Sequence, residues 1–457
     1  MIFNAANILL LAGVFMGIGL LWPWSVFRQD QRFASLLICF WIGWALSIGF
    51  LQVWQLAFPV TLPTLLILIA VSALGWLRER RQIAGALRGW GLKRVLWTGG
   101  LALVPALMLA NHVLFTSPNS DYALYHLQSV KWLGAYRIVP GLGNLYNPLA
   151  LNCSSFLYTA VINTGWLAGR AYYLSNTLPA FVLILQCAAG FYGLLTRGEV
   201  LNSDLFYALM IPVVLLYAST TELVGYSPDV IVFFLQIVLG GEVLRLLEDP
   251  PGRELFLRRA TTLVLLAATA FTVKLSLGAF GLLCLLAAAA LGVRRYRLWP
   301  WRSPRLWAGW IALGLSLALV WMARSVVISG YPLFPSAVLG FPVPWKMPLQ
   351  LVLDAGAVIQ LWAQTNNAAF PYTGDWTWFR QWWNAFPFFV RQAFVIALGL
   401  LALNQALAVI FRKKTSRDVG ASVLAVISFA SLIFWFTMAP SYRHSGALFW
   451  IFLAAEM

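Results

Sequence analysis

The sequence is poor in charged residues, and most of the charges it has are of one sign. Only 10% of its 457 residues are Asp, Glu, Lys or Arg, with 15 acidic side chains against 31 basic ones. Hydrophobic residues make up 61% of the chain, and the mean hydropathy is +0.80. This composition lies far from that of soluble globular domains and predicts a polytopic membrane protein.

Cysteine and histidine are also scarce. The four cysteines are scattered, and three of them lie in apolar segments without metal-ligand spacing, so neither a disulfide framework nor a zinc site is predicted. The three histidines are equally dispersed, and we predict no metal site, although a divalent metal held by Asp229 stays open. We expect no appended soluble domain. The basic residues form no basic face outside short loops, which excludes nucleic acid as a partner.

Apolar runs of about 17 to 25 residues predict about 12 to 13 membrane-spanning helices in one all-α domain over residues 1–457. The first run lacks a basic segment before it and a cleavage site after it, which predicts a retained span. The predicted spans are 5–22, 34–57, 61–77, 95–114, 172–196, 204–221, 229–247, 260–275, 277–293, 306–327, 388–411, 419–437 and 446–457.

Basic residues set the predicted orientation. The segments "RQDQR", "RERR" to "LKR", "TRGE", "EDPPGRELFLRR", "RRYRLWPWRSPR" and "RKKTSRD" all fall on one face, with 22 of the 31 Lys and Arg there or at adjacent helix ends. An excess of Lys and Arg marks the cytoplasmic side. To keep all these basic segments on the cytoplasmic face, the chain must form two short helices that meet near Lys274. The alternative is one long tilted helix, which would invert the orientation of every later span.

Two long segments lie on the opposite, outward face, where site residues are usually carried. The first covers 115–170 and contains two predicted interfacial helices, "YALYHLQSVKWLGAY" and "CSSFLYTAVINTGWLAG". The second covers 328–387 and contains the aromatic stretch "YTGDWTWFRQWW", which suits the membrane interface.

Ionisable side chains in or against a membrane are costly, so each one is a candidate site. Asp121 follows "SPNS", a sequence typical of a helix start. The alternative to a role in the site is a structural one, in which the carboxylate lies in the first turn of the helix and interacts favourably with the helix dipole. The lysine and arginine side chains on the outward face also have an alternative role, which is to extend to the lipid phosphates at the membrane surface.

Five motifs in order resemble the GT-C membrane glycosyltransferases, in particular the lipid-linked-sugar and protein-mannosyltransferase-like branch. They are the stretch from Asp121 through Tyr122, Tyr125, Gly134 and Val139-Pro140 to Phe156-Leu157-Tyr158; "SPDVIVFF" with Asp229; "FTVKLSLG" with Lys274; "ARSVVISGYPLFP" with Arg324; and "APSYRHSG" with Arg443. The resemblance covers about residues 95 to 457, and residues 1–94 would add extra N-terminal spans.

The resemblance implies an inverting transfer of a sugar from a polyprenyl-phosphate-linked donor to an envelope glycan, lipid or protein acceptor. The implied general base is Asp121, since one carboxylate must reach the acceptor hydroxyl. Cations must face the leaving phosphate, and Lys274, Arg324 and Arg443 are the candidates. The implied substrate-binding residues are Tyr122, Tyr125, His126, Asp229, Tyr442 and His444.

The expected location is the bacterial inner membrane, with the site facing the periplasm. Three other functions stay open. A lipid-linked polysaccharide polymerase or ligase shares these substrates, and a lipid-sugar transporter or flippase shares the buried charges. A non-catalytic assembly protein is the third, and the ordered Asp, Lys and Arg positions argue against it.

Overall fold

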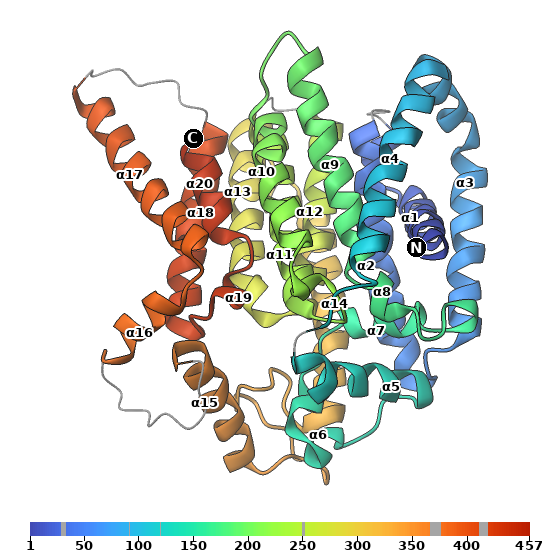
Figure 1. Cartoon of the computed structure of the whole chain (residues 1–457), viewed down its shortest axis with the longest axis vertical. Coiled ribbons are helices and arrows are strands. Elements are labelled where there is room, and N and C mark those ends of the chain that lie inside the picture. Colours follow the sequence, from blue (N-terminus) through green and yellow to red (C-terminus); the bar gives the residue numbers. More distant parts are fainter. Residues whose placement is uncertain (29–32, 91, 119, 249–251, 366–375, 411–418) are drawn as a thin grey trace.

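The computed structural model describes residues 1–28, 33–90, 92–118, 120–248, 252–365, 376–410 and 419–457. All regular elements among them are helices, and most run side by side in one bundle (Figure 1). The expected all-α polytopic bundle is therefore confirmed.

The bundle is built from long helices with short ones at one end. The long helices are α1 (Ile2–Leu20), α2 (Phe33–Ala57), α3 (Leu62–Trp90), α4 (Leu92–His112), α9 (Thr177–Thr196), α10 (Asn202–Ala218), α11 (Pro228–Leu247), α12 (Arg253–Val273), α13 (Gly278–Tyr296), α14 (Pro304–Ser329), α15 (Leu349–Thr365), α17 (Phe388–Ile410) and α18 (Val419–Met438). The short helices are α5 (Leu127–Ala135), α6 (Leu142–Leu145), α7 (Ser155–Val161), α8 (Ala171–Leu174), α16 (Trp378–Ala385), α19 (Tyr442–Ser445) and α20 (Leu448–Glu456).

Each predicted span corresponds to a helix, but fewer helices are long and apolar enough to cross a bilayer. Nine pass that test among the described residues, or ten if the bent pair α16 and α17 forms one span. The predicted 12 to 13 is therefore higher than the number found. Helix α10 has 17 residues and α20 has 9, while the described apolar part of α4 is 102–112.

The chain reverses direction at Lys274, as the two-helix prediction required. Helix α12 ends at Val273, Lys274 has an extended backbone, and α13 begins at Gly278. The two helices pack against each other, so the alternative of one long tilted helix is wrong.

The described parts of the basic segments gather at one end of the bundle, which we call the arginine end. Most of "RQDQR" and all of "RKKTSRD" lie outside the described residues. There Arg28 pairs with Glu79 (2.8 Å between Nη2 and Oε1), and Arg258 Nη1 donates to the carbonyl of Pro23 (3.0 Å). The opposite end, which we call the loop end, is formed by residues 113–118, 120–176, 330–365 and 376–387. Figure 1 shows α5, α6 and α15 there, away from the junction of α3 and α4.

The three N-terminal helices pack into the rest of the bundle. Helices α1 and α2 approach closely at Gly43, where a Cβ atom would lie 1.8 Å from the carbonyl oxygen of Phe15. Trp41 Nε1 of α2 donates to Gln186 Oε1 of α9 (2.7 Å). Helices α1, α2 and α3 therefore contribute to the main hydrophobic core.

One of the two predicted interfacial helices is buried. Every residue of α7 is buried, and Tyr158 donates its hydroxyl to the carbonyl of Ser175 (2.9 Å). Phe15 and Trp44 pack on the same ring. The apolar residues of this segment surround the helix on all sides, so burial satisfies them better than a position at the interface.

Candidate functional site

Asp121 lies at the loop end, where the chain leaves α4 and starts a new helix. The next five residues, Tyr122–His126, form a π-helical turn before α5 begins. Such turns are rare and are frequently found at functional sites. The Asp121 side chain is 26% exposed, and its Oδ2 atom lies 3.2 Å from Nη1 of Arg443. The carboxylate is therefore paired and still accessible.

Arg443 is held by a turn that three other segments fix in place. The carbonyl of Pro440 accepts from Trp382 Nε1, and that of Ser441 accepts from Trp435 Nε1 (2.8 Å). Gly446 follows with a positive φ of 57°, which glycine adopts without strain.

The end of this turn is fastened to α11. Gln236 Oε1 accepts the backbone N–H of Ala447 (2.6 Å). A Cβ atom at Gly446 would lie 2.3 Å from that same oxygen. The close approach of the turn to α11 therefore requires glycine at this position.

Lys274 forms the second ion pair of the site. Its Nζ atom donates to Oδ1 of Asp229, which opens α11 directly after Pro228. The Lys274 side chain is 24% exposed and that of Asp229 is 9% exposed. Ser154 supports the end of α12 because its N–H donates to the carbonyl of Thr272 (3.0 Å).

These four side chains, Asp121, Asp229, Lys274 and Arg443, form what we call the four-charge cluster. The two pairs are electrostatically coupled: burial alone would lower the pKa of Arg443, but the carboxylates of Asp229 and Asp121 outweigh burial and raise it. Two positive and two negative charges balance, which reduces the cost of removing them from water. All four are candidate site residues in the sequence analysis.

Two histidines lie within the field of this cluster. Burial lowers the pKa of His126 to about 4 and that of His444 to about 3. Both imidazoles are therefore neutral near pH 7. His126 packs between Tyr125 and Phe156, with ring centroids 4.4 and 5.4 Å away, and neither of its ring nitrogens has a hydrogen-bond partner among the described residues.

The three predicted substrate-binding tyrosines lie in different surroundings. Tyr122 packs against Tyr172 and Tyr226, each with its ring centroid 5.1 Å away. Tyr125 is partly buried, and burial raises its pKa well above the ordinary value. Tyr442 is 39% exposed. Only Tyr125 and Tyr442 are close enough to the cluster for their pKa values to reflect the charge of Arg443.

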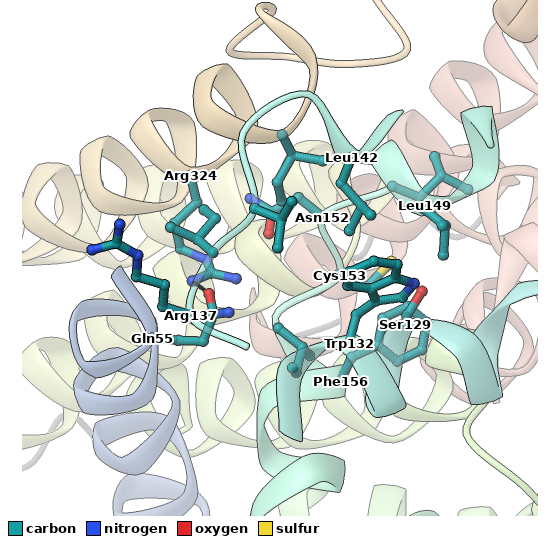
Figure 2. A pocket seen from close by; sticks show the side chains of 15 residues that line it. Gln55, Ser129, Trp132, Arg137, Leu142, Leu149, Asn152, Cys153, Phe156 and Arg324 are labelled. Carbon is teal, nitrogen blue, oxygen red and sulfur yellow. Dashed lines mark hydrogen bonds between the residues drawn. The ribbon is translucent and has the colours of Figure 1, made fainter. Parts of the chain in front are cut away.

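Arg324 lies apart from the other predicted site cations. It is 2% exposed, and its Nη1 donates to Gln55 Oε1 (2.5 Å), while its Nε has no partner among the described residues. Figure 2 shows it on one side of a cavity of about 40 Å³, with Asn152 and Ser129 on other sides. This volume holds roughly two water molecules.

This cavity, which we call the Arg324 cavity, contains no carboxylate among its lining residues, and the exposed Arg137 adds a second cation. It borders the region of the four-charge cluster through Phe156, which packs on His126, and through Cys153. Burial raises the pKa of the Cys153 thiol to about 12, with Lys274 and Asp229 acting on the same thiol. The Arg324 cavity is therefore a positively charged site next to the four-charge cluster, in which positive and negative charges balance.

Sequence reasoning missed two buried amide side chains that complete the site. Gln55 and Gln236 are amides buried inside spans, and one binds Arg324 while the other holds the Arg443 turn. Glu222 acts on the pKa values of Arg443 and Tyr442. Buried polar side chains in apolar runs are unusual, and that signal was available for both glutamines. Among the described residues, no three His, Cys, Asp or Glu side chains gather as potential metal ligands.

The fold and site together define an integral membrane protein with a charged site at one end of a helical bundle. Residues 1–450 match the family profile described as Domain of unknown function (DUF8201), so the chain belongs to that family. Comparison with curated proteins and with solved structures finds no match.

Proposed function

We propose that the protein is a GT-C-like membrane glycosyltransferase that moves a sugar from a polyprenyl-phosphate-linked donor to an envelope glycan, lipid or protein acceptor. The four-charge cluster supports this proposal most directly. Its members come from four distant segments, and each is the residue that the resemblance assigns to the site. A scaffold would have no need for two coupled ion pairs of which one, Asp121 with Arg443, is accessible.

Asp121 is the proposed general base. In an inverting transfer, the carboxylate removes the proton of the acceptor hydroxyl while that oxygen forms a bond to the anomeric carbon. The bond from this carbon to the phosphate oxygen breaks, and its electron pair leaves with the phosphate. The 26% exposure of Asp121 gives an acceptor access to the carboxylate, whereas Asp229 is buried and held by Lys274.

Cations stabilise the negative charge that develops on the leaving phosphate. Arg443 and Lys274 take this role at the reacting centre, where Asp121 and Asp229 hold them in place. Arg324 binds the donor phosphate from the adjacent cavity, because its guanidinium has amide and carbonyl partners but no carboxylate partner among the described residues. A cation without a counter-ion attracts a phosphate more strongly than a paired one.

Neutral and aromatic groups complete the proposed site. Tyr125, Tyr442 and Tyr122 supply hydroxyls and ring faces for a sugar. His126 and His444 are uncharged near pH 7 and act as hydrogen-bonding groups. The proposed orientation places the loop end in the periplasm of a bacterial inner membrane, because the basic segments gather at the other end.

The test is transfer of radiolabelled sugar from a panel of polyprenyl-linked donors in membranes that carry the protein. Asp121→Asn should lower the rate by about 10²- to 10⁴-fold. Asp354→Asn is the matched control, because Asp354 is an exposed carboxylate at the same end that accepts a hydrogen bond from Gln350 (2.8 Å). Transfer that is unaffected by Asp121→Asn would remove Asp121 from the role of base.

The same panel separates the remaining functions. A polymerase or ligase would transfer a preassembled glycan and not a single sugar from these donors. A transporter would transfer nothing and would move lipid-linked sugar across the bilayer of reconstituted liposomes. Movement of lipid-linked sugar without any transfer would overturn the glycosyltransferase proposal.

A further inference from the structure

A second cavity lies at the arginine end, on the side of the bundle formed by α13. Its volume is about 720 Å³. One wall is apolar and consists of Leu286, Ala289, Ala290 and Val293 from successive turns of α13. The cavity is therefore far larger than the Arg324 cavity and continues along a membrane-facing helix.

The other wall of this cavity carries Arg294, Arg297 and Arg302. All three side chains are exposed, and none of them pairs with a carboxylate in the described part of the chain. Other arginines at the same end are paired, as Arg258 is with Glu254 (2.8 Å). Three unpaired guanidinium groups at one cavity make its charge strongly positive.

The backbone that carries these arginines is fixed. Arg297 caps α13 in the left-handed conformation, with φ 54°, at a position where glycine is usual because other residues are strained there. The next residue, Leu298, is buried; its N–H donates to Gly292 O (3.1 Å), and its carbonyl accepts from Trp307 Nε1 (2.9 Å). The fold therefore keeps an arginine where glycine would fit better, which points to a role for its side chain.

We infer that this cavity binds an anionic phospholipid, with its phosphate on the three arginines and an acyl chain along α13. The apolar wall favours a lipid over a soluble anion, because Leu282 and Leu286 extend it with exposed fractions of 57% and 55%. Trp299 stacks on Trp301 with ring centroids 4.7 Å apart, an arrangement suited to the headgroup level. Basic pockets beside spanning helices recognise anionic headgroups through this chemistry.

The experiment offers the detergent-solubilised protein an equimolar mixture of phosphatidylglycerol and phosphatidylcholine and counts the bound lipids by native mass spectrometry. The wild type should prefer phosphatidylglycerol. Arg297→Gly should reduce that binding about fivefold, and the double variant Arg294→Gln/Arg302→Gln about 25-fold. The melting temperature of Arg297→Gly should be unchanged or higher, because glycine relieves the strained cap.

A matched control removes two charges from the same end outside the cavity. Arg80→Gln/Arg81→Gln changes two exposed arginines of α3, and it should leave the lipid preference intact. Equal binding of the two lipids to the wild type would overturn the inference. An equal loss of phosphatidylglycerol binding in the control and in the double variant would also overturn the inference. It would show that the lipid is attracted only by the general positive charge of this surface.

Discussion

Two charge networks of this protein contrast in their access to the outside. In the four-charge cluster, the paired Asp121 and Arg443 side chains are 26% and 31% exposed. In the second network, which we call the Glu242 network, Glu242 is 0% exposed and binds both Arg245 (2.7 Å) and Arg259 (3.0 Å). Both networks join helices through ion pairs, but only the first leaves room for a substrate to compete for its charges.

The Glu242 network is closed by its surroundings. The guanidinium of Arg245 lies over the ring of Tyr207, 5.0 Å from its centroid, and the side chains of Arg245 and Arg259 are 11% and 9% exposed. Buried ion pairs of this kind serve specific packing, and removal of one partner leaves an uncompensated charge. The ion pairs of the Glu242 network therefore hold the bundle together, whereas the pair of Asp121 and Arg443 remains available to a substrate.

The largest effect on stability should come from the closed network. Glu242→Gln removes the buried carboxylate that binds both Arg245 and Arg259 and should lower the free energy of unfolding by ~3–5 kcal/mol. Asp121→Asn, which stops sugar transfer in the proposed mechanism, should change it by less than about 1 kcal/mol, because that pair is accessible to water. Thermal unfolding in detergent measures both, and a larger loss for Asp121→Asn would contradict the distinction.

A smaller effect is expected from the Arg324 cavity, where Arg324 has no counter-ion in the part of the chain that the structure describes. Arg324→Met should raise the KM for the lipid-linked donor about tenfold, the order expected for a charge-assisted contact to phosphate. The melting temperature should stay level or rise, because an unpaired buried charge is removed. A lower melting temperature with an unchanged KM would show that Arg324 acts only in packing.

The smallest effect concerns pH. The folded state keeps His126 neutral down to a pKa of about 4, whereas the unfolded chain binds its proton near pH 6.5. The unfolded state therefore binds more protons between these values, and stability falls as pH decreases through this window. Asp121 and Asp229 oppose the shift, while Lys274 and Arg443 add to the effect of burial.

His126→Phe keeps an aromatic ring in this position and removes the titrating group. The wild type should lose about 0.7 kcal/mol from this group between pH 7 and pH 6, and the variant should lose that much less. Unfolding curves at several pH values measure the difference. Parallel pH dependence in the two proteins would mean that His126 has the same pKa in the folded and unfolded states, which would contradict the prediction.

Much of the fold could be predicted from the sequence because hydropathy and basic residues act locally. The helix reversal at Lys274 followed from the need to keep "RRYRLWPWRSPR" and "EDPPGRELFLRR" on one face. The members of the four-charge cluster could be named because ionisable groups are rare in such a chain.

The remaining features depend on tertiary contacts that no local pattern records. The separation of Arg324 from Lys274 and Arg443 follows from its bond to Gln55 across two helices. The burial of α7 follows from the helices around it, since an apolar helix can face lipid or protein equally well. The π-helical turn at Tyr122 depends on backbone hydrogen bonding, which residue type does not specify.

The ion pair between Asp121 and Arg443 also has a consequence for biosynthesis. One partner lies near the end of α4, and the other lies beyond α18, so the ribosome must produce almost the entire bundle before they can meet. A nascent chain that has inserted its first dozen helices already carries the proposed base but lacks the cation beside it. Synthesis that stops early would therefore leave an incomplete site in the membrane.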